Sequence, residues 1–235
     1  MLSRAALRRA AHRAVTLSGL GAPAGPHLTR YRMYRRLSGV LAELPDGPVG
    51  GGAGQRVLAI SGSAGFAREI GFDAARITSA DFPTVNLLDL PYPTGGFDGV
   101  VSDQVLEHVR GDPFRAVRES VRVVRPGGLV VHTTCFLNWV HPDPGDFWRF
   151  TPDALRLLCD GVAEPVEVGG WGNLSLFALT RLGLRYAPVP AARWHPLHWA
   201  ATRNNPRWPV TTWLVARKPT ASARGAPGGR DVRPA

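Results

Sequence analysis

The chain has little cysteine and no long apolar run. Its two cysteines, Cys135 and Cys159, lack the C-x-x-C spacing of zinc and redox sites, which predicts a reducing, cytoplasmic setting and no metal site. No window holds the ~18 consecutive apolar residues of a membrane-spanning helix. The apolar fraction of 44% is ordinary for a globular protein, and 235 residues can form one α/β domain with short extensions.

Lysine is also scarce: the 28 basic residues include a single lysine, Lys218. The net charge of +10 lies at the ends of the chain. Residues 1–36 carry eight arginines and no acid, residues 217–235 add a net +4, and residues 37–216 sum to −2. Basic ends suit nucleic acid or an anionic membrane surface. We attribute the high arginine content to the codon bias of a GC-rich genome. Binding to nucleic acid is therefore disfavoured, and weak contact of the N-terminus with a membrane surface stays an open alternative.

Composition divides the chain into three parts. Residues 1–54 read as a basic helical lead-in with a Gly/Pro linker, 55–218 as the folded domain, and 219–235 as a disordered tail. Within the domain, short apolar runs alternate with helical segments, which predicts an α/β fold with a mostly parallel, seven-stranded sheet and helices on both faces. Strands are expected at 56–60, 76–80, 84–88, 97–102, 128–134, 164–170 and 211–217, and helices at 64–70, 103–109, 113–124, 152–159 and 173–182. The pairs Asp112-Pro113 and Thr151-Pro152 are typical of helix starts.

The stretch VLAISGSAG, residues 57–65, has the layout of a strand that ends in a nucleotide-binding loop. Three aliphatic residues lead into small ones, and a helical segment follows. Gly62 and Gly65 let the backbone approach a ligand closely, and Ser61 and Ser63 are among the next smallest choices. A glycine-rich loop alone is a weak signal, so its interpretation depends on the rest of the chain.

Further motifs give the chain a family resemblance. The run 98–109 (DGVVSDQVLEHV) and the run 119–128 (ESVRVVRPGG), preceded by Leu90-Pro91-Tyr92-Pro93, stand in the order and spacing of a known pattern. The chain resembles the class I S-adenosylmethionine-dependent methyltransferases, of the methyltransferase type 11 kind, over residues 56–180. The resemblance implies a Rossmann-like fold and S-adenosyl-L-methionine as cofactor.

The resemblance also implies a set of cofactor-binding residues. Ser61, Gly62, Ser63 and Gly65 match the loop that holds the methionine end, Asp81 the carboxylate that binds the ribose, and Asn86 the adenine contact, with Asp89 as its fallback. Asp103 lies after the fourth family strand, where the methyl group would point, and capping of a helix by Ser102 or Asp103 is the structural alternative. Ala59 departs from the family, which usually has an acidic residue there.

The segment 133–152 follows the fifth family strand and is therefore expected beside the methyl donor. It combines His141 and Asp146 with several aromatic residues, a mixture that suits sugars and other semi-polar small molecules. Either His141 or Asp146 can take a proton from an acceptor hydroxyl. In the structural alternative, Asp146 pairs with Arg149 or Arg156 and His141 faces solvent. The D-F-W-R-F-T-P run also resembles a bacterial subgroup found with cell-envelope glycan synthesis.

These features predict a methyltransferase that acts on a small-molecule or glycan-like acceptor, at oxygen. Two alternatives stay open: a non-catalytic binding module with a decayed cofactor site, and a nucleic-acid methyltransferase. The divergent loop favours the first alternative. The absence of an acid-x-Pro-Tyr motif after residues 97–102 counts against the second, since Asp89–Tyr92 precedes that strand. The oligomeric state is not predicted.

Overall fold

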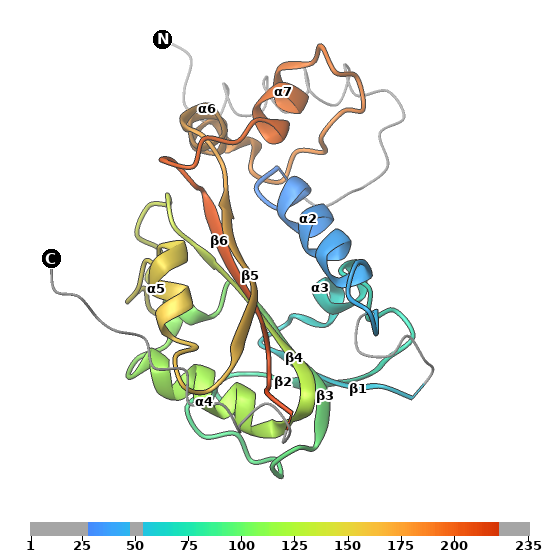
Figure 1. Ribbon diagram of the computed structural model, residues 1–235. Coiled ribbons are helices and arrows are strands. Elements are labelled where there is room, and N and C mark those ends of the chain that lie inside the picture. Colours follow the sequence, from blue (N-terminus) through green and yellow to red (C-terminus); the bar gives the residue numbers. More distant parts are fainter. Residues whose placement is uncertain (1–27, 48–53, 221–235) are drawn as a thin grey trace, which may run out of the picture.

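The computed structural model describes residues 28–47 and 54–220, so the predicted disordered tail lies mostly outside the described residues. Its centre is a six-stranded sheet in the order β2-β1-β3-β4-β6-β5 (Figure 1). The strands are β1 (Arg56–Ile60), β2 (Arg76–Ala80), β3 (Phe97–Asp103), β4 (Val124–Cys135), β5 (Glu164–Trp171) and β6 (Thr211–Arg217). Neighbours from β2 to β4 pair in parallel, and β6 pairs antiparallel with both β4 and β5. The prediction of a mostly parallel sheet is confirmed.

The prediction of seven strands is wrong, because residues 84–88 form turns rather than a strand. The Val85 amide donates to the Asp81 carbonyl at 3.0 Å, which closes one turn. The side chain of Asn86 then accepts from the Leu88 amide at 2.9 Å, an Asx-type turn. These local hydrogen bonds leave a single bridge between Asn86 and Asp89 in place of a paired strand.

Helices cover both faces of the sheet, as expected (Figure 1). The helical segments are α2 (Tyr31–Ala42), α3 (Ala64–Glu69), a short 3-10 turn (Leu106–His108), α4 (Pro113–Val123), α5 (Pro152–Leu157), α6 (Leu174–Leu179), a π-helical turn (Thr180–Leu184) and α7 (Pro196–Thr202). The predicted starts of α4 and α5 are confirmed: Asp112 accepts from the Phe114 amide and Thr151 from the Ala154 amide.

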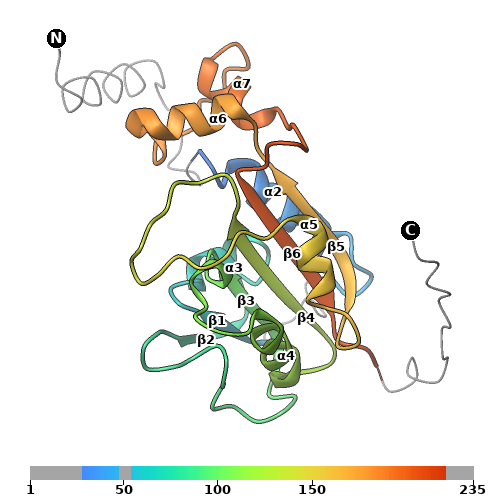
Figure 2. The ribbon, with the colours of Figure 1, turned by 90° about the vertical axis from the view of Figure 1, so that its left-hand side faces the viewer.

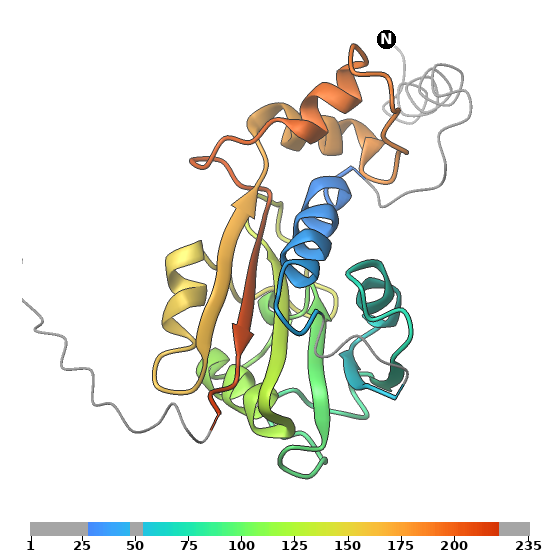
Figure 3. The ribbon, with the colours of Figure 1, turned by 45° about the vertical axis from the view of Figure 1, so that its right-hand side comes forward.

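Apolar side chains gather in three clusters that explain this arrangement. One face of the sheet packs on α4 and α5, through residues such as Val117 and Leu155. The other face packs on α2 and α3, through Leu37 and Phe66 among others. A third cluster joins α6 and α7 beyond the end of the sheet (Figure 3). The helix α2 is thus part of the second core, and the predicted domain boundary at residue 54 stays a prediction.

A buried histidine links two central strands. His132 on β4 lies opposite Ser102 on β3, and its Nδ1 is 2.7 Å from the Ser102 hydroxyl oxygen. His132 is fully buried, and its Nε2 has no hydrogen-bond partner among the described residues. Burial disfavours the charged ring and lowers the pKa of His132 to about 4. The ring is therefore neutral in the folded protein at neutral pH.

This histidine should make the fold sensitive to mild acid. An unfolded chain protonates His132 near its ordinary pKa of ~6.5, whereas the folded chain resists protonation until about pH 4, so stability is lost as pH falls through this window. We expect His132 to contribute a loss of about 2 kcal/mol in the free energy of unfolding between pH 7 and pH 5. Urea unfolding at both pH values measures it. The His132→Gln variant should not show this loss, whereas the control variant His198→Gln should show it in full. If the free energy of unfolding depends on pH equally in all three proteins, His132 is not the cause.

Candidate active site

A cavity of about 580 Å³ opens at the carboxyl ends of β1 and β3. At this point the strand order reverses: β2 lies on one side of β1, and β3, the next strand along the chain, lies on the other side. Ligands of open α/β sheets bind at such a point. The lining residues are Ile60, Ser61, Phe82, Val85, Asn86, Leu87, Leu88, Gln104, Val105, His108, Val109, Arg110, Pro144 and Phe147. We call this cavity the main cleft.

The loop after β1 has the backbone shape that a closely approaching ligand needs. Ser61 and Gly62 have φ values of +48° and +77°, a left-handed conformation that glycine adopts at little cost. A Cβ at Gly62 would meet no atom within 4 Å, so the space above it is open. The Gly62 amide donates to Asp81 Oδ1 at 2.8 Å. Asp81 thus fixes the loop from the end of the neighbouring strand, at the place predicted for the ribose carboxylate.

The two other small residues of the loop have different surroundings. Ser63 is buried, and its hydroxyl donates to the Ile60 carbonyl while accepting from the Asp103 amide at 2.8 Å. This hydroxyl joins the ends of β1 and β3 and is already occupied as a donor. Gly65 lies exposed in the first turn of α3, and a Cβ there would also meet nothing within 4 Å. Ser61 therefore lines the main cleft, Gly62 lies next to it with open space at its Cβ position, and Ser63 supports the loop from inside.

Of the two residues predicted to contact the adenine, only Asn86 lines the main cleft. Its side-chain oxygen accepts from the Leu88 amide. Asp89, the fallback, points to solvent: its side chain is 84% exposed, and its nearest cation is Arg115 at 4.0 Å. Asn86 is thus the candidate adenine contact that lies at the cleft.

Asp103 forms the centre of a hydrogen-bond network that the sequence did not predict. Its Oδ2 accepts from the Tyr34 hydroxyl at 2.6 Å and from Arg30 Nε at 3.4 Å, and its Oδ1 accepts from the Thr133 hydroxyl at 2.6 Å. Burial opposes the charge of Arg30, but Asp103, Tyr34 and Glu107 together outweigh it and raise the pKa of Arg30. Burial and Asp103 raise the pKa of Tyr34 well above its usual range. The network ties α2 to the ends of β3 and β4.

The loop between β4 and α5 lies beside the main cleft, where Pro144 and Phe147 line it (Figure 2). Within this loop Asp146 binds Arg149 through both carboxylate oxygens and accepts from the His141 amide at 3.0 Å. Hydrogen bonding to Arg149 lowers the pKa of Asp146 to about 2. At neutral pH Asp146 is thus an anion with little affinity for a proton. His141 Nδ1 lies 3.3 Å from Asp146 Oδ2 and 3.2 Å from the Trp139 carbonyl oxygen.

His141 also belongs to a second group of polar residues. Glu107, Cys135 and His141 each carry a side-chain atom of a type that binds metal ions, and these three atoms lie within 4.8 Å of one another. Glu107 is fully buried, and its Oε1 accepts from the Cys135 amide at 3.3 Å. Burial raises the pKa of the Cys135 thiol to about 12, so the thiol is protonated at neutral pH. No sequence spacing indicated this group, since its members come from three different segments.

Comparison with known proteins agrees with this geometry. A protein-family model described as a methyltransferase domain matches residues 49–132. A 2-methyl-6-phytyl-1,4-hydroquinone methyltransferase from rice, Oryza sativa subsp. japonica, is 43% identical over 72 residues, which is 30% of this chain and 19% of that protein. A probable S-adenosylmethionine-dependent methyltransferase of Mycolicibacterium smegmatis is 35% identical over 98 residues, 41% of this chain and 37% of that protein. The chain thus spans well under half the length of these relatives.

Solved structures extend the likeness to nearly the whole chain. The cyclase SpnF superposes with a TM-score of 0.53 at 20% identity, over 94% of this chain and 98% of its own. Phosphoethanolamine N-methyltransferase 2 of Haemonchus contortus, solved with S-adenosyl-L-methionine, gives a TM-score of 0.54 at 13% identity, over 93% of this chain and 58% of its own. Residues 49–132 thus match a methyltransferase-domain family, and the chain shares its fold with these solved structures.

The residues at the main cleft fit the cofactor of this family. The open space above Gly62 accepts a close ligand, and Asp81 is exposed at the same loop with one carboxylate oxygen on the Gly62 amide. Apolar side chains such as Leu87 and Val109 supply a surface for a flat base. Ala59 is buried without a charge and pairs with Val101 on β3, and the carboxylate of Asp103 lies two residues further along β3. Among the described residues, no helix is long and apolar enough to span a membrane.

Proposed function

We propose that the protein transfers a methyl group from S-adenosylmethionine to an oxygen of a small-molecule or glycan-like acceptor. The observation that carries this proposal is the turn at Ser61-Gly62, held by Asp81, at the mouth of a cleft between β1 and β3. A decayed site would have no reason to keep left-handed backbone, open space and an exposed carboxylate together. The family match supports the reaction class, and the fold alone does not, since a structural neighbour is described as a cyclase.

In this proposal each cleft residue has a distinct role. When bound, S-adenosylmethionine supplies an electrophilic methyl group on a sulfonium sulfur. Ser61, Gly62 and Gly65 hold the methionine end, Asp81 the ribose and Asn86 the adenine. Asp103 and Ser63 position the loop from β3, because their polar atoms are engaged with the protein. Most of the catalysis is then positioning, which is the main contribution in such transfers.

We assign proton removal to His141 and a positioning role to Asp146. Asp146 is a poor base because Arg149 holds its pKa at about 2. His141 carries a ring nitrogen beside that carboxylate, and an imidazole is suited to accept a hydroxyl proton at neutral pH. The proton of the acceptor hydroxyl passes to the ring as the new bond to oxygen forms. A cytoplasmic location is part of this proposal and fits the two protonated, buried thiols.

Calorimetry with the full chain tests the proposal. We expect both S-adenosylmethionine and S-adenosylhomocysteine to bind with micromolar affinity, about −7 to −8 kcal/mol. Asp81→Ala should weaken binding by about 1.5–3 kcal/mol, because it removes the ribose acceptor and the partner of the Gly62 amide. Asp89→Ala removes an exposed carboxylate nearby and should bind as the parent does. Absence of heat with the parent protein would favour the decayed binding module instead.

A further inference from the structure

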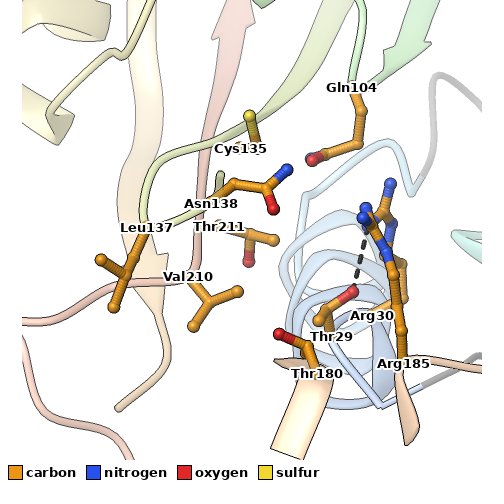
Figure 4. A pocket seen from close by; sticks show the side chains of 10 residues that line it. All are labelled: Thr29, Arg30, Gln104, Cys135, Leu137, Asn138, Thr180, Arg185, Val210 and Thr211. Carbon is orange, nitrogen blue, oxygen red and sulfur yellow. Dashed lines mark hydrogen bonds between the residues drawn. The ribbon is translucent and has the colours of Figure 1, made fainter. Parts of the chain in front are cut away.

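A small recess lies on the other side of Gln104 from the main cleft. It has a volume of about 10 Å³, of the order that one water molecule occupies. Its lining residues come from the segment before α2, from the ends of β3 and β4, from the π-helical turn and from the start of β6 (Figure 4). They are Thr29, Arg30, Gln104, Cys135, Leu137, Asn138, Thr180, Arg185, Val210 and Thr211.

The recess is cationic and rich in hydrogen-bond donors. Two guanidinium groups, of Arg30 and Arg185, lie side by side at one wall, and the amide groups of Gln104 and Asn138 point toward the same space (Figure 4). None of the described residues that line it is acidic. Asp103, the carboxylate that binds Arg30, is engaged by Tyr34 and Thr133 as well.

Two donors in this recess have no acceptor among the described residues. Arg185 Nε and Thr211 Oγ1 are buried and make no hydrogen bond within the described parts of the chain. Arg185 also forms no ion pair with a described carboxylate within 4.0 Å. Burial and the adjacent charge of Arg30 both lower the pKa of Arg185, so the second cation is held at a cost. A buried guanidinium N–H and a buried hydroxyl without partners are costly unless a ligand supplies the missing acceptors.

We propose that the recess binds a carboxylate group of the methyl acceptor. A planar carboxylate has the acceptor atoms that paired guanidinium and hydroxyl donors match. Because the recess has room for one water-sized group, one carboxylate oxygen enters it, and the rest of the acceptor extends past Gln104, which lines both the recess and the main cleft. This inference rests on the proposed function and narrows it: the acceptor is a hydroxy acid, and a glycan-like acceptor is an acidic sugar.

The cofactor also carries a carboxylate, at its methionine end, and this group is the alternative ligand of the recess. The loop residues Ser61 to Gly65, at which the methionine end is placed, do not line the recess. The lining residues come instead from the segment before α2, from the ends of β3 and β4, from the π-helical turn and from the start of β6, and none of them belongs to β1 or β2. The acceptor is therefore the source that the geometry favours.

Acetate and acetamide are the probes that test the carboxylate, because each is small, each can place one oxygen in the recess, and they differ in charge. The thermal midpoint of the full chain, saturated with S-adenosylhomocysteine, is measured during titration of each. We expect acetate to raise the midpoint in a saturable way and acetamide to leave it unchanged. Arg185→Gln and the isosteric Thr211→Val should each weaken acetate at least tenfold, whereas Arg181→Gln, which removes an exposed arginine outside the recess, should not. An acetate response equal in the parent and both recess variants would overturn the proposal.

A second measurement separates the two sources of carboxylate. Calorimetry compares S-adenosylhomocysteine with 5′-methylthioadenosine, which lacks the amino-acid end, in the parent and in Arg185→Gln. We expect Arg185→Gln to change neither affinity by more than twofold. A tenfold loss for S-adenosylhomocysteine alone would assign the recess to the cofactor and refute the acceptor proposal. If S-adenosylhomocysteine does not bind to the parent, the result counts against the methyltransferase function. The acetate titration is then made on the protein without S-adenosylhomocysteine, and it decides whether the recess binds a carboxylate.

Discussion

Gly62→Val is expected to abolish binding of S-adenosylhomocysteine while the domain stays folded. Gly62 has a φ of +77° and open space where a Cβ would be, so the protein itself has room for the side chain. A ligand above the loop has no such room. The backbone strain of a non-glycine residue at positive φ is about 1–2 kcal/mol, too little to unfold a typical domain. Calorimetry reports the binding, and circular dichroism confirms the fold.

Gly47→Val supplies a control that is matched in strain. Gly47 also has a positive φ, of +58°, and open space at its Cβ, but it lies in the turn after α2 and not at the main cleft. Both variants should lose similar stability, and only Gly62→Val should lose the ligand. If Gly62→Val binds as tightly as Gly47→Val, the stretch VLAISGSAG is a strand and a turn without a cofactor role.

Asp103→Asn is expected to lower the free energy of unfolding by about 3 kcal/mol. The substitution leaves the buried Arg30 without its carboxylate partner, and an uncompensated buried charge is costly. It also weakens the hydrogen bonds that Tyr34 and Thr133 donate. Chemical denaturation of the parent and the variant measures the difference.

Two further variants make this expectation specific. Asp46→Asn removes a carboxylate that is 68% exposed and 3.7 Å from Arg217, so it should cost no more than about 0.5 kcal/mol. Arg30→Met combined with Asp103→Asn removes both charges, so its cost should be smaller than the sum of the two single variants. A loss in Asp103→Asn as small as that in Asp46→Asn would show that α2 does not depend on this carboxylate.

The sequence predicted the elements whose signals are local. The Asp112-Pro113 and Thr151-Pro152 pairs mark the starts of α4 and α5 because a cap and its helix are neighbours in the chain. The same reasoning failed at residues 84–88, where apolar residues suggested a strand. There the side chain of Asn86 bonds the backbone two residues on, and this turn prevents pairing with the sheet.

The site was predictable only where it follows a strand. The loop at residues 61–65 and Asp81 could be placed because the ends of parallel strands meet at one edge. The contacts of Asp103 with Arg30 and Tyr34 could not, because α2 is about 70 residues away in the chain and no spacing reports its packing. The recess was missed for the same reason, since Arg185 and Thr211 have no local motif.

The reversed direction of β6 has a consequence for how a ligand acts on the whole chain. Because β6 runs antiparallel to β4, its first residue, Thr211, lies beside the last residue of β4, Cys135. The recess is thereby assembled from positions 29 to 211, nearly the full described length. Any partial opening that releases α2 or β6 destroys it. Ligand binding should therefore protect amides throughout the sheet from hydrogen exchange, rather than those of one loop, since only the complete fold binds.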